Sequence, residues 1–115
     1  MHLGSVVNSA GADFKMMGLK RTAVVSSKPV IGICAVRTGC GKSQTTRKVS
    51  EILKNAGKKI AVIRHPMPYG DLSAQAVQRF ESIEDLKKHD CTIEEMEEYE
   101  PHINRDTIVY AGVDY

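Results

Sequence analysis

The sequence lacks tryptophan, and aromatic residues make up only 5% of its 115 positions. Cysteine is also scarce: Cys34, Cys40 and Cys91 are odd in number and form no CxxC pair. A disulfide framework needs paired cysteines and a zinc site needs clustered ligands, so this pattern argues against both. Three unpaired thiols fit a reducing cytoplasm, where we expect the protein to reside.

Long hydrophobic runs are absent as well. The longest apolar stretch, VIGICAV at residues 30–36, has the length of a strand and not of a membrane-spanning helix. The N-terminal segment has neither the basic start nor the continuous apolar core of a signal peptide. We therefore expect no interaction with a membrane.

The net charge of +2 hides an asymmetry along the chain. Residues 1–64 contain 12 Lys and Arg against 2 Asp and Glu, whereas residues 65–115 contain 4 against 12. We interpret the basic half as the part that holds a polyphosphate and the acidic half as solvated helix faces. No aromatic residues interleave with the basic ones, so we expect no nucleic-acid partner.

The hydrophobic pattern predicts an α/β fold. Residues 29–36, PVIGICAV, predict a strand buried on both faces of a parallel sheet, and residues 58–65 predict a second one. Between them, SQTTRKVSEILKNAG predicts a helix that ends at Gly57. Its apolar side chains at helical spacing are Val49, Ile52, Leu53 and Ala56. Strand, glycine turn, helix and strand form a right-handed βαβ unit.

The second half of the chain is mostly polar. We expect a helix over residues 72–80 capped by Asp71, and a strand over residues 107–115. Two capping boxes predict the starts of two short helices; their residues are Ser82 with Asp85 and Thr92 with Glu95. The run EEMEEYE predicts a solvated helix face formed by Glu94, Glu95, Glu97 and Glu98.

The turn RTGCG and the following KS predict a phosphate-binding loop. Gly39 and Gly41 allow the backbone to curl so that successive N–H groups face one anion. Lys42 is the catalytic cation that reaches the phosphates, and Ser43 is the expected Mg²⁺ ligand at the start of the helix. The other expected nucleotide contacts are Thr38, Cys40, Gln44 and Thr45. The cofactors would be ATP and Mg²⁺.

Two positions qualify this match. The usual GxxxxGK[ST] pattern begins with glycine at the place of Val36, a residue that supplies no phosphate ligand through its side chain. Arg37 stands where one subgroup of P-loop ATPases carries a second lysine, and we count it as a catalytic cation. The alternative for Arg37 is an exposed arginine without a role.

The segment RHPMPYGD is the second candidate site. It follows a predicted strand at its carboxyl end, where open α/β sheets bind ligands. Arg64 and His65 are candidates for binding an anionic substrate, and Asp71 for ligating Mg²⁺ through water or capping the next helix. The alternative is a rigid proline turn.

Several motifs in one order resemble the cyclic 2,3-diphosphoglycerate synthetase family. They are VRTGCGKSQTTR, RHPMPYGDL, QAVQRF, CTIEEMEEYEPHI and YAGVDY. The resemblance implies a P-loop ligase that uses ATP to join two phosphates of 2,3-bisphosphoglycerate, a phosphorylated small molecule, into a cyclic anhydride. That activity is typical of archaeal metabolism. Oligomeric state is left open.

The resemblance also implies a domain organisation, because the family's chains are several times longer. Residues 1–28 would be the tail of a preceding domain and a linker, and residues 29–115 the N-terminal part of an incomplete P-loop nucleotide-binding domain. Two alternatives to the ligase are a GTPase-like nucleotide switch and an inactive gene remnant.

Overall fold

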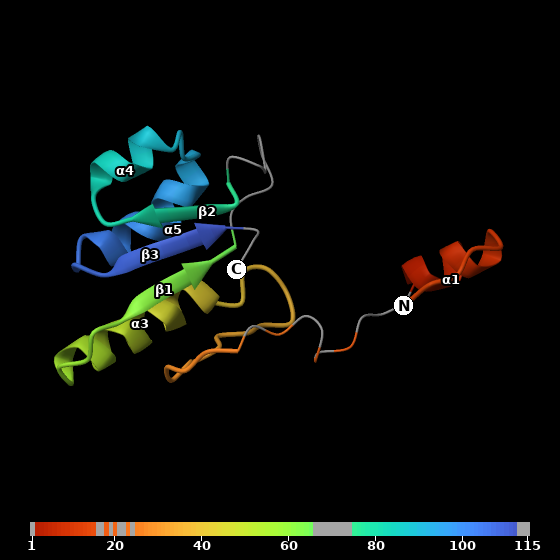
Figure 1. Cartoon of the computed structure of the whole chain (residues 1–115), viewed down its shortest axis with the longest axis horizontal. Coiled ribbons are helices and arrows are strands. Elements are labelled where there is room, and N and C mark those ends of the chain that lie inside the picture. Colours follow the sequence, from red (N-terminus) through yellow and green to blue (C-terminus); the bar gives the residue numbers. More distant parts are fainter. Residues whose placement is uncertain are drawn as a thin grey trace. The chain divides into compact units, whose positions relative to one another are not determined.

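The computed structural model describes residues 2–15, 18, 20, 23, 25–65 and 75–112 (Figure 1). The chain divides into two compact units, Met1–Val30 and Ile31–Tyr115. Within the described residues, every helix is too short or too polar to cross a membrane. The interpretation of residues 1–28 as the tail of a preceding domain stays a prediction.

The described residues of the first unit include helix α1 (His2–Ser9). None of its side chains is buried. Gly11 adopts a left-handed φ of 76° just after the helix, and the Ala12 N–H returns to the Val7 carbonyl at 3.2 Å. Glycine takes this conformation without steric cost, so it ends the helix.

The second unit is built on a three-stranded mixed sheet. Strands β1 (Ala61–Arg64), β2 (Val77–Phe80) and β3 (Ile108–Gly112) lie in the order β1-β3-β2. β1 runs parallel to β3, whereas β2 runs antiparallel to it, as the arrows in Figure 1 show. The strand predicted over residues 107–115 is confirmed within the described part, but an all-parallel sheet is wrong.

The strand predicted at residues 29–36 does not form. These residues are irregular, and most of their apolar side chains face solvent: Val30 is 73% exposed, Ile31 58% and Val36 99%. An apolar run becomes a buried strand only if a neighbouring strand and a covering layer accept it. The described part of the chain supplies neither, so the P-loop NTPase-type βαβ core is not confirmed.

The prediction of a helix over residues 72–80 is also wrong for the residues that the structure describes. Residues 72–74 lie outside the described part, and Val77–Phe80 is strand β2. Its side chains alternate: Gln78 and Phe80 are buried, whereas Val77 and Arg79 are exposed. That period of two fits β3 beside it and outweighs the weaker helical spacing.

Among the described residues of this unit, three helices accompany the sheet: α3 (Lys42–Asn55), α4 (Ile83–Lys88) and α5 (Ile93–Ile103). Both predicted capping boxes are confirmed. The Ser82 and Thr92 hydroxyls accept from the N–H groups of Asp85 and Glu95, whose carboxylates accept from the cap residues' N–H groups in return. Each box satisfies backbone donors that a helix start leaves unpaired.

The core lies on one face of the sheet. Val62, Phe80, Val109 and Ala111 face Leu86 of α4 and Tyr99 and Ile103 of α5. The pairing register explains this set, because Val109 lies opposite both Val62 and Phe80. On the other face Ile63 is 67% exposed and Val77 61%. The expectation that β1 is buried on both faces is therefore wrong.

Candidate functional site

The predicted phosphate loop ends in two left-handed glycines. Gly39 has a φ of 78° and Gly41 a φ of 83°, and α3 begins at the next residue, Lys42. Gly41 is the N-cap residue and has no side chain to accept from the first-turn N–H groups. Such a helix start combines unpaired donors with the positive end of the helix dipole, which suits an anion.

Lys42 lies across this loop. Its ammonium contacts the Arg37 carbonyl at 3.4 Å, which is long for a hydrogen bond. Arg37 and the other expected nucleotide contacts Thr38, Cys40, Gln44 and Thr45 are exposed. The loop residues are thus open to a ligand.

Ser43 and Arg64 meet at one carboxylate. The Ser43 hydroxyl donates to Glu98 Oε1 at 2.7 Å, and the Arg64 guanidinium donates to Glu98 Oε2. The side chains of Arg64 and Glu98 are 22% and 27% exposed, so the pair is partly shielded from water. Glu98 on α5 therefore joins the start of α3 to the end of β1.

The geometry of the sheet explains this meeting. Arg64 ends β1 beside Ala111 of the parallel strand β3, so it stands at the carboxyl edge of the parallel pair. Figure 1 shows the loop before α3 at the same end of the sheet, by the arrowhead of β1. Ligand sites in α/β folds gather at this edge.

A proline in α5 frees a backbone carbonyl that α3 uses for a contact. Pro101 lies inside α5 and has no N–H, so the carbonyl of Glu97, four residues earlier, loses its helical donor. The Arg47 guanidinium of α3 donates to that carbonyl at 3.0 Å. One turn from Ser43 along α3, this contact holds the helix where Ser43 reaches Glu98.

The face of α3 toward α5 is polar. Ser43, Arg47, Ser50 and Lys54 share it at helical spacing; Ser50 is the helix's buried residue, and Lys54 donates to the carbonyls of Arg105 and Asp106. The apolar residues expected to face inward do not do so fully. Ile52 is 56% exposed and Ala56 is exposed, while Val49 and Leu53 are half-buried.

Positive charge surrounds His102, which is buried on α5 beside these groups. Burial lowers the pKa of His102, and the cations Arg64, Arg47 and Arg105 lower it further, while Glu98 opposes them. Burial is thus the main cause of the lowered pKa of His102, and three arginines with one opposing carboxylate account for the rest.

Cysteine reactivity should differ between the loop and the core. Cys34 and Cys40 are exposed. Burial and the nearby carboxylates of Glu95 and Asp90 raise the pKa of the Cys91 thiol to about 11. Because the thiolate is the reactive species, Cys91 is the protected thiol of the three.

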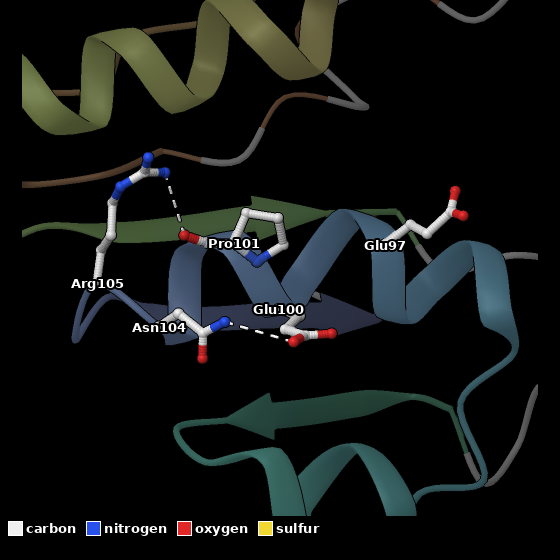
Figure 2. Close-up of a pocket in the computed structure, with 5 residues that line it drawn as sticks. All are labelled: Glu97, Glu100, Pro101, Asn104 and Arg105. Carbon is white, nitrogen blue, oxygen red and sulfur yellow. Dashed lines mark hydrogen bonds between the residues drawn. The ribbon is translucent and has the colours of Figure 1, made fainter.

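The remaining predicted residues are placed only in part. His65 follows β1 and is exposed, whereas Asp71 lies outside the described residues. Within the described part, no group of His, Cys, Asp and Glu forms a metal cluster. Figure 2 shows a pocket lined by Glu97, Glu100, Pro101, Asn104 and Arg105; none of the predicted nucleotide contacts lines it.

Glu98 is the site residue that sequence reasoning missed. The solvated acidic face is wrong for two of its members, because Glu95 is 4% exposed and Glu98 faces Ser43. A usable signal existed: Tyr99 and Ile103 mark the buried side of α5, and Glu95, Glu98 and His102 flank them at helical spacing.

Comparison with known proteins gives one informative relative. The chain is 64% identical over all 115 residues to a protein named Arginine synthetase ArcE from Thermococcus kodakarensis, and it spans 26% of that protein's length. No protein-family model matches the chain. No solved structure matches it either.

This relative corrects the function that the resemblance implied. Its name is arginine synthetase and not cyclic 2,3-diphosphoglycerate synthetase. The prediction that the protein cyclises 2,3-bisphosphoglycerate is therefore wrong. The two alternatives, a GTPase-like switch and an inactive gene remnant, gain no support from the relative.

The charge around His102 generates a prediction for stability against pH. Its folded-state pKa lies below the ordinary value of 6.5, so the unfolded chain binds the proton more readily. The stability that neutral His102 provides is complete above that value and is lost as the pH falls through the folded pKa. We expect the Tm to drop between about pH 7 and pH 5 in the wild type and less in His102→Gln.

The control is His2→Gln, which changes an exposed histidine on α1. It should keep the wild-type dependence of Tm on pH, measured by circular dichroism. Equal slopes for the wild type and His102→Gln would contradict the assignment.

Proposed function

We propose that the chain is the part of an arginine synthetase that binds the phosphates of ATP together with Mg²⁺. One observation carries the proposal: two left-handed glycines lead directly into a helix whose first residues are Lys42 and Ser43. The 64% identity to a protein named as a synthetase supports an enzyme, since synthetases couple bond formation to a nucleotide.

Each loop residue has a physical role in this proposal. The N–H groups at the start of α3 and the loop backbone would bind phosphate oxygens. Lys42 and the second cation Arg37 would neutralise charge on the transferred phosphoryl group, and Ser43 would ligate Mg²⁺. The exposed side chains of Thr38, Gln44 and Thr45 would complete the contacts.

Arg64 and His65 are proposed to bind the anionic part of the second substrate. For a reaction that makes arginine, that part is the α-carboxylate of the amino acid. Arg64 stands at the carboxyl edge of β1, next to the phosphate loop through Glu98. A guanidinium matches the geometry of a carboxylate, which favours Arg64 for this contact.

The first test removes the phosphate contact of Lys42. Lys42→Ala should weaken Mg-ATP binding by about 1.5–3 kcal/mol, because a charge-assisted contact is lost. That is roughly a 10- to 100-fold higher Kd in a calorimetric titration of the full chain. Lys48→Ala is the control, since Lys48 lies on the same helix and pairs with Glu51 at 3.0 Å on the surface. Equal Kd values for both variants would exclude this loop.

A second test uses the thiols. Cys40 lies between the two left-handed glycines, so bound Mg-ATP should slow its alkylation at about pH 8. Cys34 is exposed and outside the loop and should react at the same rate with or without nucleotide. Cys91 should react far more slowly than either in both conditions. Mass spectrometry of each peptide measures the rates, and unprotected Cys40 at saturating nucleotide would speak against the loop.

The third test addresses the amino acid. With Mg-ADP in place of Mg-ATP, L-arginine, the product of the proposed reaction, should bind the chain, whereas agmatine, which keeps the guanidinium but lacks the α-carboxylate, should bind more weakly. Arg64→Ala should weaken L-arginine binding by roughly tenfold or more, as expected for one charged hydrogen bond, and leave nucleotide affinity within about threefold. Nucleotide binding without any preference for arginine would remove the arginine part of the proposal alone.

A further inference from the structure

The carboxylate of Glu98 is bonded at both oxygens. Oε1 accepts from the Ser43 hydroxyl at 2.7 Å, and Oε2 accepts from the Arg64 guanidinium. Three elements, α3, β1 and α5, meet at this one group. Its position is not explained by core packing, since the apolar core residues of α5 are Tyr99 and Ile103.

The contact determines which way the Ser43 hydroxyl can act. A serine hydroxyl has one proton to donate and two lone pairs to offer. With its proton directed to Glu98, its lone pairs point elsewhere and are available to a cation. Ser43 is the second residue of α3, directly after Gly41 and Lys42, so the available lone pairs belong to the proposed phosphate site.

Glu98 also supplies negative charge among the cations near Ser43. Its negative charge is paired with Arg64, while Lys42 and Arg47 add positive charge on α3. A divalent cation beside Ser43 would be attracted by Glu98 and repelled by Arg64. The two charges therefore act on such a cation with opposite signs.

We propose that Glu98 is a positioning residue for Mg²⁺ of the bound nucleotide and that Arg64 tunes this metal site through Glu98. The inference rests on the proposed function of the loop. Glu98 orients the Ser43 oxygen toward the metal and supplies negative charge near it, without itself contacting the phosphates. Arg64 transmits changes at the end of β1 to the same carboxylate.

The experiment measures the Kd of the full chain for ATP with Mg²⁺ and with EDTA. The ratio of the Kd with EDTA to the Kd with Mg²⁺ gives the benefit of Mg²⁺ for ATP binding. Glu98→Gln keeps an oxygen for Ser43 but removes the charge, so the benefit of Mg²⁺ should fall by at least about tenfold. Arg64→Gln removes the repelling charge, so the benefit should stay equal or rise. Glu97→Gln, an exposed neighbour on α5, should match the wild type.

A purely structural role predicts a different pattern. If Glu98 and Arg64 only fasten three elements together, both variants should lower the Tm and weaken ATP binding with and without Mg²⁺ alike, which leaves the ratio unchanged. An unchanged ratio in Glu98→Gln, or a fall of equal size in Glu98→Gln and Arg64→Gln, would overturn the inference. Circular dichroism and the Tm of each variant report whether it is folded.

Glu98→Asp covers the case in which Glu98→Gln does not fold. The shorter carboxylate keeps the charge but cannot reach Ser43 and Arg64 as before, so the ratio should fall by less than in Glu98→Gln and by more than in Glu97→Gln. A ratio equal to the wild type would also overturn the inference. Failure of the proposed function gives a different result. The wild type would then bind no ATP, or would bind it with the same affinity as Lys42→Ala.

Discussion

The position of α3 depends on one missing backbone donor. Pro101 cannot donate to the Glu97 carbonyl, so that carbonyl is free to accept from Arg47. The Arg47 guanidinium donates to it at 3.0 Å and so fastens α3 to α5. With Arg47 held there, Ser43 lies one turn away and reaches Glu98 at 2.7 Å. A carbonyl that proline leaves without its helical donor thus becomes one of the contacts that hold α3 beside α5.

This mode of attachment makes the site polar throughout. The buried residue of α3 is Ser50, and Arg47 and Lys54 donate to carbonyls at the two ends of the α3–α5 contact. Apolar burial instead holds α4 and α5 on the sheet, through Leu86, Tyr99 and Ile103. Directional polar contacts fix the position of a helix start more precisely than an apolar contact of the same area. Each donor must meet its acceptor at hydrogen-bonding distance and angle.

Sequence reasoning succeeded where the determinants are local. The start of α3, its end at Asn55 just before the left-handed Gly57, and the capping boxes at Ser82 and Thr92 follow from residues within a few positions of each other. It failed where a distant partner decides. The run at residues 29–36 needs strands beside it, β2 takes its form from β3, and Glu98 faces Ser43 only after α3 docks on α5. The loop glycines were therefore predictable and the carboxylate was not.

The same charges link the fold to the proposed activity. Arg47 and Arg64 are held by a carbonyl and a carboxylate, and together with Arg105 they lower the pKa of buried His102. Burial is the first cause of that lowered pKa and disfavours a charge of either sign, while the three arginines add to it. The arginines themselves are the groups that would attract the phosphates of the proposed site. Arg47 thus fastens α3 to α5 and also places positive charge one turn from Ser43, as the proposed phosphate site requires.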